Sequence, residues 1–245
     1  MNIFGITDRG KVRKENQDSY IIERCDRRNS AVIAICDGMG GAKAGDLASQ
    51  LACKAFVSGV YDAMLSTKYY TESPERILKS SCADANGVVF EYSGFDANYS
   101  GMGTTLVGGI VSKRKAQLIN VGDSRAYHLT KEGITQITRD HSYVNELIAL
   151  GAITPEEAAT HPQKNVITRA LGVERRVEAD YFETELKRGD CILLCSDGLS
   201  NMVSDSEIFA VYNANSKPEE ICKLLLKMTL ERGAKDNVSV LAVTI

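Results

Sequence analysis

Two uninterrupted apolar runs that each lead into Asp-Gly constrain this chain most strongly. Residues 31–38 read AVIAICDG, and residues 191–198 read CILLCSDG. An apolar run without alternation is typical of a strand that is buried on both faces, and glycine marks a turn after it. A carboxylate at the end of such a strand is costly to bury unless a cation or hydrogen-bond donors compensate it. The two runs therefore predict buried strands that carry Asp37 and Asp197 to a site.

A third strand-like run, residues 116–121, ends two residues before Asp123. Asp-Gly is also a common signal of a β-hairpin turn, and for a single occurrence that interpretation is the simpler one. In a hairpin, however, Asp-Gly stands between two alternating segments, whereas Asp37 and Asp197 each follow a run that does not alternate. The recurrence favours three strands that bring three carboxylates together.

Length and composition predict one ordinary globular domain over residues 1–245. The chain is 44% hydrophobic and 25% charged, and its net charge is −3 with both signs well mixed. We therefore expect no nucleic-acid partner and no anionic-membrane partner, because both require a basic surface. The sequence shows no signal-peptide pattern and no apolar run near the ~20 residues of a membrane span. We expect a cytoplasmic monomer that acts on protein or small-molecule partners.

The order of periodic segments predicts strands, two helices, strands, two helices and a last strand. Helix-start signals stand at Ser73-Pro74, at Ser204 with Glu207, and at Ser216 with Glu219. Residues 103–138 read as an antiparallel meander, since its turns are too short for crossover helices.

This order favours an α+β fold, a β-sandwich of two antiparallel sheets flanked by pairs of helices in four α-β-β-α layers. From residue 139 to residue 172 the strand pattern lapses, and Thr154 and Glu157 form a capping box for a short helix. We expect this insertion to be a flap over the edge of a sheet.

Five aspartates lie at boundaries of apolar runs and are the candidates for one shared site. If they converge, they cannot all ionise without cations, because like charges raise each other's pKa. Ligation by oxygen alone favours Mg²⁺ or Mn²⁺, and a pair of such ions about 3.5–4 Å apart suits phosphoester hydrolysis. Alone, Arg13 would be a solvated charge; beside the aspartates its guanidinium suits a phosphate. The candidates are Asp18, Asp37, Asp123, Asp197 and Asp236.

Six short motifs, taken together, resemble the protein phosphatase 2C (PPM) family of metal-dependent protein serine/threonine phosphatases. The likeness covers nearly the whole chain and is greatest to compact bacterial members that consist of the catalytic domain alone. The motifs are Arg13–Asp18, Asp37–Gly41, Gly103–Thr105, Gly122–Arg125, Ser196–Gly198 and Asp236-Asn237, in the family's order and spacing.

The resemblance implies a two-metal centre of Mg²⁺ or Mn²⁺. Asp37 would bridge the two ions, the Gly38 carbonyl would bind one of them, and Asp197 and Asp236 would complete the other. Asp37 and Asp197, together with Arg13, would be the catalytic residues.

Two further aspartates would surround this centre. Asp18 would act mainly through water, and Asp123, with Asp197, would hold the third ion that bacterial members can bind. Arg13 would hold the substrate phosphate.

The implied reaction is hydrolysis of phosphoserine and phosphothreonine in proteins by direct attack of metal-activated water. The partners would be phosphorylated proteins, among them a cytosolic serine/threonine kinase and its substrates. One departure matters: Ala42 stands where many relatives carry a histidine proposed to protonate the leaving alkoxide. The general acid is therefore open between His141 and water, with water preferred. A catalytically silent relative that binds phosphorylated proteins is the alternative.

Overall fold

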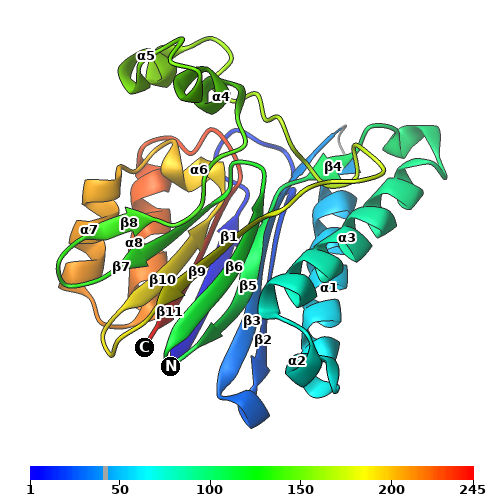
Figure 1. Cartoon of the computed structure of the whole chain (residues 1–245). Helices are drawn as coiled ribbons and strands as arrows, with labels where there is room; N and C mark the ends of the chain where they lie inside the picture. Colours follow the sequence, from blue (N-terminus) through cyan, green and yellow to red (C-terminus); the bar gives the residue numbers. More distant parts are fainter. Residues whose placement is uncertain (41–43) are drawn as a thin grey trace.

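The computed structural model describes residues 1–40 and 44–245 and has two antiparallel sheets packed face to face (Figure 1). The predicted sandwich is confirmed. One sheet has the order β1-β11-β10-β7-β8, formed by Asn2–Asp8, Val238–Thr244, Cys191–Cys195, Arg125–Leu129 and Ile134–Gln136. The other has the order β2-β3-β5-β6-β9, formed by Asp18–Cys25, Ser30–Met39, Leu106–Ser112, Lys115–Val121 and Asp180–Glu185, and β4 (Gly103–Thr104) pairs with the end of β3.

Helices cover the outer face of each sheet, which confirms the four layers. The β2-β3 side carries α1 (Ala44–Leu65), α2 (Lys68–Thr71) and α3 (Pro74–Ser93), and the other side carries α6 (Asp197–Ser200), α7 (Asp205–Ala214) and α8 (Pro218–Glu231) (Figure 1). The remaining short elements are the 3₁₀ turns η1 (Asp26–Arg28) and η2 (Ala97–Tyr99). Within the described residues no helix is both long enough and apolar enough to cross a membrane.

Two of the predicted helix starts are confirmed and one is corrected. Ser73 caps α3 by accepting a hydrogen bond from the Arg76 amide, and Ser204 with Glu207 forms a capping box on α7. The capping box predicted at Ser216 is wrong, because α8 begins at Pro218 and its N-cap is Lys217. Proline has the helical φ and no N–H to satisfy, so it takes the first helical position and moves the N-cap to the residue before it.

Strand β3 shows why the apolar run does not alternate. Its odd-numbered residues Ala31, Ile33 and Ile35 pack in the core between the sheets, while its even-numbered residues pack in the core under α1. Both faces of the strand are therefore buried, as predicted. Asp37 continues the odd-numbered row, so it lies where the space between the sheets opens at their end.

The chain changes sheets after β6, so the continuous meander predicted over residues 103–138 is wrong. Strands β5 and β6 are neighbours, but β7 pairs with β10 and β8 in the other sheet. The change occurs at Gly122, which has φ 103°, and a Cβ there would lie 2.6 Å from Cγ2 of Thr105. Only glycine suits this turn, which leads Asp123 to the end of the sandwich.

The segment predicted as an insertion contains two helices rather than one. Helices α4 (Tyr143–Ala149) and α5 (Pro155–Thr160) stand beyond the end of the sandwich (Figure 1). The predicted capping box of Thr154 and Glu157 begins α5. The structure caps α4 with Ser142, which accepts a hydrogen bond from the Asn145 amide.

Candidate active site

The five predicted aspartates meet at one end of the sandwich. Asp18 and Asp37 are directly paired across β2 and β3, Asp197 begins α6 after β10, and Asp236 lies just before β11. Asp123 lies in the turn between β6 and β7. Burial first, and then repulsion by each of the other four, holds the pKa of Asp37 well above its usual range. The convergence predicted from the sequence is therefore found.

Asp18 links the two sheets. Its carboxylate Oδ2 accepts hydrogen bonds from Ser196 Oγ at 2.8 Å and Ser239 Oγ at 2.7 Å. Ser239 lies on β11 of the opposite sheet, and Ser196 directly follows β10 of that sheet. The residue is only 5% exposed, and burial raises its pKa to about 7. Its other oxygen, Oδ1, is buried without a hydrogen-bond partner. A cation, or a water held by one, would satisfy that oxygen.

Asp197 presents a second buried oxygen of this kind. Its Oδ2 accepts a hydrogen bond from Asn201 Nδ2 at 3.0 Å, whereas Oδ1 has no hydrogen-bond partner. Burial, and then repulsion by Asp236, raises the pKa of Asp197. Asp123 behaves alike: burial and then repulsion by Asp197 raise its pKa to about 7.

The backbone around Asp37 is held firmly by two threonines of the Gly-Thr-Thr motif. The Asp37 amide donates to Thr105 Oγ1 at 2.9 Å, and its carbonyl accepts from Thr104 Oγ1 and the Thr105 amide, each at 2.9 Å. Thr105 Oγ1 also lies 2.8 Å from Ser124 Oγ, next to Asp123. These bonds fix the relative positions of two of the aspartates.

Gly38 lies where no side chain fits. A Cβ on this residue would stand 2.0 Å from the Gly45 carbonyl oxygen and 2.7 Å from that of Gln17. The Gly38 amide donates to the same Gln17 oxygen at 3.0 Å. The end of β3 is thus enclosed by backbone, and its glycine is required by close approach.

Arg13 reaches the acidic cluster from the loop before β2, as the sequence predicts. Its Nη2 lies 2.7 Å from Asp236 Oδ2, and this bond, with weaker attraction from Asp37 and Asp197, raises the pKa of Arg13. The Arg13 side chain is 53% exposed. An exposed ion pair contributes little stability, so the guanidinium can exchange its carboxylate for an incoming anion at little cost.

His141 supports the site and does not face its centre. Its Nδ1 accepts a hydrogen bond from the Gly122 amide at 3.1 Å, so the ring proton lies on Nε2, which contacts Asp180 Oδ2 at 3.1 Å. Burial is the main cause that lowers the pKa of His141, which keeps the ring neutral. Nδ1 therefore holds the turn before Asp123, and Nε2 is engaged with the start of β9. No local pattern signals this role, because Gly122 and Asp180 are distant in sequence.

A partly buried ion pair beside this turn also escaped sequence reasoning. Arg125 donates from Nε and Nη2 to both oxygens of Asp140, with a shortest distance of 2.7 Å. The pair anchors the start of β7 to the segment that leads into α4.

The donor set fits hard divalent cations. Across residues 1–40 and 44–245, no three aspartate, glutamate, histidine or cysteine side chains are already arranged as ligands of a single metal ion. Mg²⁺ and Mn²⁺ need no such cluster, since they keep several waters and take one or two carboxylates and carbonyl oxygens each. Cations would relieve both the repulsion among the buried aspartates and the two unpartnered oxygens. Ala42 and Gly41, singled out in the sequence, lie outside the described residues.

Comparison with known proteins decides the family. Residues 9–228 match the model of the family described as protein phosphatase 2C. The chain belongs to the protein phosphatase 2C family.

Members of this family resemble the chain over its whole length. The serine/threonine phosphatase stp of Listeria welshimeri is 38% identical over 97% of this chain and 93% of its own. The protein phosphatase PhpP of Streptococcus pneumoniae is 36% identical over 100% and 97%. The solved catalytic domain of the serine/threonine protein phosphatase PstP, in complex with two manganese ions, has 33% identity and a TM-score of 0.83 over 98% of this chain and 96% of that one.

Proposed function

We propose that this chain is a metal-dependent protein phosphatase that hydrolyses phosphoserine and phosphothreonine in proteins. The observation that carries the proposal is the meeting of five aspartates, two of them with unpartnered buried oxygens, beside the exposed guanidinium of Arg13. Clustered carboxylates attract divalent cations, and the bound cations together with Arg13 attract a phosphate. The names of the relatives, all phosphatases, support the same reaction.

We assign the core metal centre to four residues. Asp37 would hold both ions, the Gly38 carbonyl would hold one of them, and Asp197 and Asp236 would hold the other. When bound, Mg²⁺ or Mn²⁺ lowers the pKa of water toward neutrality and offsets the negative charge of the phosphate. The two manganese ions in the PstP structure support two ions at this centre, and we place a third at Asp123 and Asp197.

The chain's own groups then bind and orient the substrate. Arg13 exchanges its ion pair with Asp236 for two hydrogen bonds to the phosphate, because the two N–H groups of a guanidinium match the spacing of two phosphate oxygens. Asp18 Oδ1 faces no protein donor and accepts a hydrogen bond from water, which aligns that water within the site. Because both His141 nitrogens are engaged elsewhere, we assign protonation of the leaving alkoxide to water.

The wider setting is proposed on the same basis. We propose that residues 1–245 form one catalytic domain, with residues 139–172 as its flap, that acts as a cytoplasmic monomer. Its partners are phosphorylated proteins, including a serine/threonine kinase and that kinase's substrates. The mixed surface charge of the sequence supports protein partners rather than nucleic acid.

Replacing Asp37 tests the proposal. We expect Asp37→Asn to reduce Mn²⁺-dependent phosphate release from a phosphothreonine peptide more than about 100-fold, because even groups that only orient metal ligands contribute about 10–100-fold. Isothermal titration calorimetry should show that the same variant binds Mn²⁺ with lower affinity. Asp84→Asn, an exposed aspartate on α3, is the matched control and should retain both properties.

Two results would overturn the proposal. Near-normal turnover by Asp37→Asn would exclude the assigned metal centre. Absence of Mn²⁺-dependent activity in the unmodified protein at every pH would instead favour the catalytically silent phosphoprotein-binding module.

A further inference from the structure

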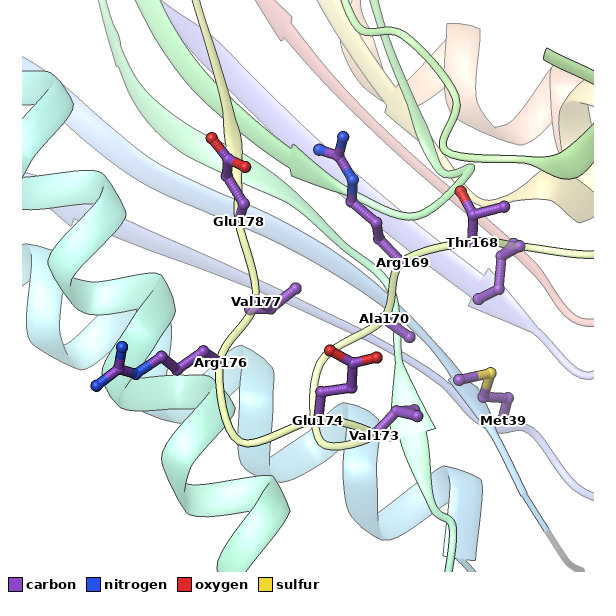
Figure 2. Close-up of a pocket in the computed structure, with 10 residues that line it drawn as sticks. Met39, Thr168, Arg169, Ala170, Val173, Glu174, Arg176, Val177 and Glu178 are labelled. Atoms are coloured by element: carbon purple, nitrogen blue, oxygen red, sulfur yellow. The ribbon is translucent and has the colours of Figure 1, made fainter. Parts of the chain in front are cut away.

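A cavity of about 340 Å³ lies beside the end of β3, against the segment that follows the flap helices (Figure 2). Figure 2 shows this segment running down one side, turning near Val173 and Glu174, and running up the other side. Val177 points from one arm toward the arm that carries Ala170, and Arg169 and Glu178 lie at the opposite end from the turn. The lining residues are Met39, Ile167–Ala170, Val173, Glu174 and Arg176–Glu178.

The cavity shares strand β3 with the candidate active site. Met39 lies two residues after Asp37 on the same strand face, a separation of about 7 Å along a β-strand. A Cβ on Gly103 would stand 2.7 Å from Met39 Cε and 2.9 Å from Val173 Cγ2. The missing side chain at Gly103 therefore lets Met39 and Val173 approach each other. The strand that carries the central aspartate also supplies part of the cavity wall.

The far wall is held in place by a buried amide. Asn86 on α3 is 1% exposed; its Oδ1 accepts from the Gly172 amide at 2.8 Å, and its Nδ2 donates to the carbonyls of Glu174 and Arg175 at 3.0 and 3.2 Å. Leu171 exchanges two backbone hydrogen bonds with Thr104, at 2.9 and 3.1 Å. A wall fixed in this way is ordered before a ligand arrives, which reduces the entropic cost of binding.

The apolar part of the lining can receive an apolar group. An apolar surface is supplied by Met39, Ile167, Ala170, Val173 and Val177. Val173 is 49% exposed, so its apolar side chain is largely in contact with water. An occupant would remove that surface from water.

The charged residues of the lining balance one another. The lining holds two arginines, Arg169 and Arg176, and two glutamates, Glu174 and Glu178. Arg169 also pairs with Asp180 at 3.0 Å, so this set of groups carries an excess of only one negative charge. The cavity therefore attracts neither sign of charge strongly. Its volume lies at the lower end of the range for ligand sites and suits one large side chain.

We propose that this cavity is a specificity pocket that receives one large apolar side chain of the substrate protein, close in sequence to the phosphorylated residue. An extended peptide advances about 3.3 Å per residue, so a side chain two or three positions from the phosphorylated residue spans the distance from Asp37 to the pocket. The inference rests on the proposed phosphatase function and adds a sequence preference to it.

A set of phosphothreonine peptides tests the pocket. Each peptide has alanine on both sides of the phosphothreonine except for a single leucine at one of three positions before or after it. We expect leucine at one position to raise kcat/KM about tenfold over the all-alanine peptide, mainly through KM, because a filled apolar pocket binds substrate and transition state alike. Glutamate or arginine at that position should give no such gain.

Variants connect that gain to the cavity. Ala170→Leu fills the pocket and Val173→Ser removes part of its apolar wall at a half-exposed position, so each should abolish the leucine gain. Leu224→Ser is the matched control, because it removes a partly exposed apolar side chain from α8 on the other side of the sandwich and should keep the gain. Thermal unfolding shows whether each variant is folded, and turnover of para-nitrophenyl phosphate normalises the rates.

The outcomes separate the two proposals. Equal rates for all peptides, with active turnover, would overturn the pocket and leave the phosphatase function standing. A greater gain with glutamate or arginine than with leucine would also overturn it. Absence of Mn²⁺-dependent release from every substrate would overturn the function, and the pocket with it.

Discussion

Substituting alanine for Gly38 adds one methyl group where the surrounding backbone leaves no space. The new carbon would lie 2.0 Å from the oxygen and 2.5 Å from the carbon of the Gly45 carbonyl, and 2.7 Å from the Gln17 carbonyl oxygen. None of these atoms can move by a side-chain rotation, so β3, the start of α1 or the loop before β2 must shift. Overpacking lowers the free energy of unfolding by about 1–3 kcal/mol, and we expect about 3 kcal/mol here because all three close contacts are with backbone atoms.

This cost can be measured by thermal unfolding. At about 2–4 °C per kcal/mol for a chain of this size, we expect Gly38→Ala to lower Tm by about 6–12 °C. We also expect weaker Mn²⁺ binding, because the displaced residue includes the carbonyl assigned to a metal ion. Gly87→Ala on α3 is the matched control: its Cβ would meet nothing within 4 Å, and removing glycine from a helix should raise stability by about 0.5–1 kcal/mol.

The two readouts refute different steps of the reasoning. An unchanged Tm for Gly38→Ala would show that the end of β3 is not tightly enclosed. A lowered Tm with unchanged Mn²⁺ affinity would preserve the packing argument and exclude the Gly38 carbonyl as a ligand.

Two further predictions concern protons and a partly buried ion pair. Burial raises the pKa of Asp18 and Asp123 to about 7 from 3.8, so the folded metal-free protein binds more protons than the unfolded chain between about pH 4 and 7, and its stability should fall as pH rises through that range. Tm in EDTA should be higher at pH 5.5 than at pH 8, and Mn²⁺ should stabilise most at pH 8; a Tm that rises with pH in EDTA would contradict this. Asp140→Asn should lower the free energy of unfolding in urea by about 3 kcal/mol, because it leaves the charge of Arg125 uncompensated. The control Glu183→Gln removes one partner of a surface ion pair and should lower it by less than about 1 kcal/mol. Similar losses for the two variants would contradict the difference in burial between the two pairs.

Local signals in the sequence were sufficient for the strands and for the aspartates. The run that ends at Asp37 reflects burial on both faces of β3, and burial leaves its mark directly on composition. The aspartates interrupt such runs or border them, so their boundary position is also visible without a structure. Their convergence could also be predicted, because strand ends on the same side of a sandwich lie close to one another in space.

Partners that are distant in sequence explain what sequence reasoning missed. Residues Gly122 to Ser124 look like a hairpin turn, and only pairing of β7 with β10 reveals that the chain has crossed to the other sheet. His141 gains its role from Gly122 and Asp180, and Asn86 from the turn after Leu171; neither contact has a local pattern. Such roles depend on packing between elements, which periodicity does not encode.

The cross-sheet bonds of Asp18 have a consequence for synthesis of the protein. Asp18 emerges from the ribosome before Ser239, which binds it and belongs to β11, the last strand of the described residues. Among the residues that the structure describes, strand β1 likewise pairs with β11 alone. Asp18 and Asp37 are already paired across β2 and β3, but Asp18 gains its bond to Ser239 in the opposite sheet only when the last strand is in place. We therefore expect the proposed metal and phosphate site to be complete only after β11 has joined the fold.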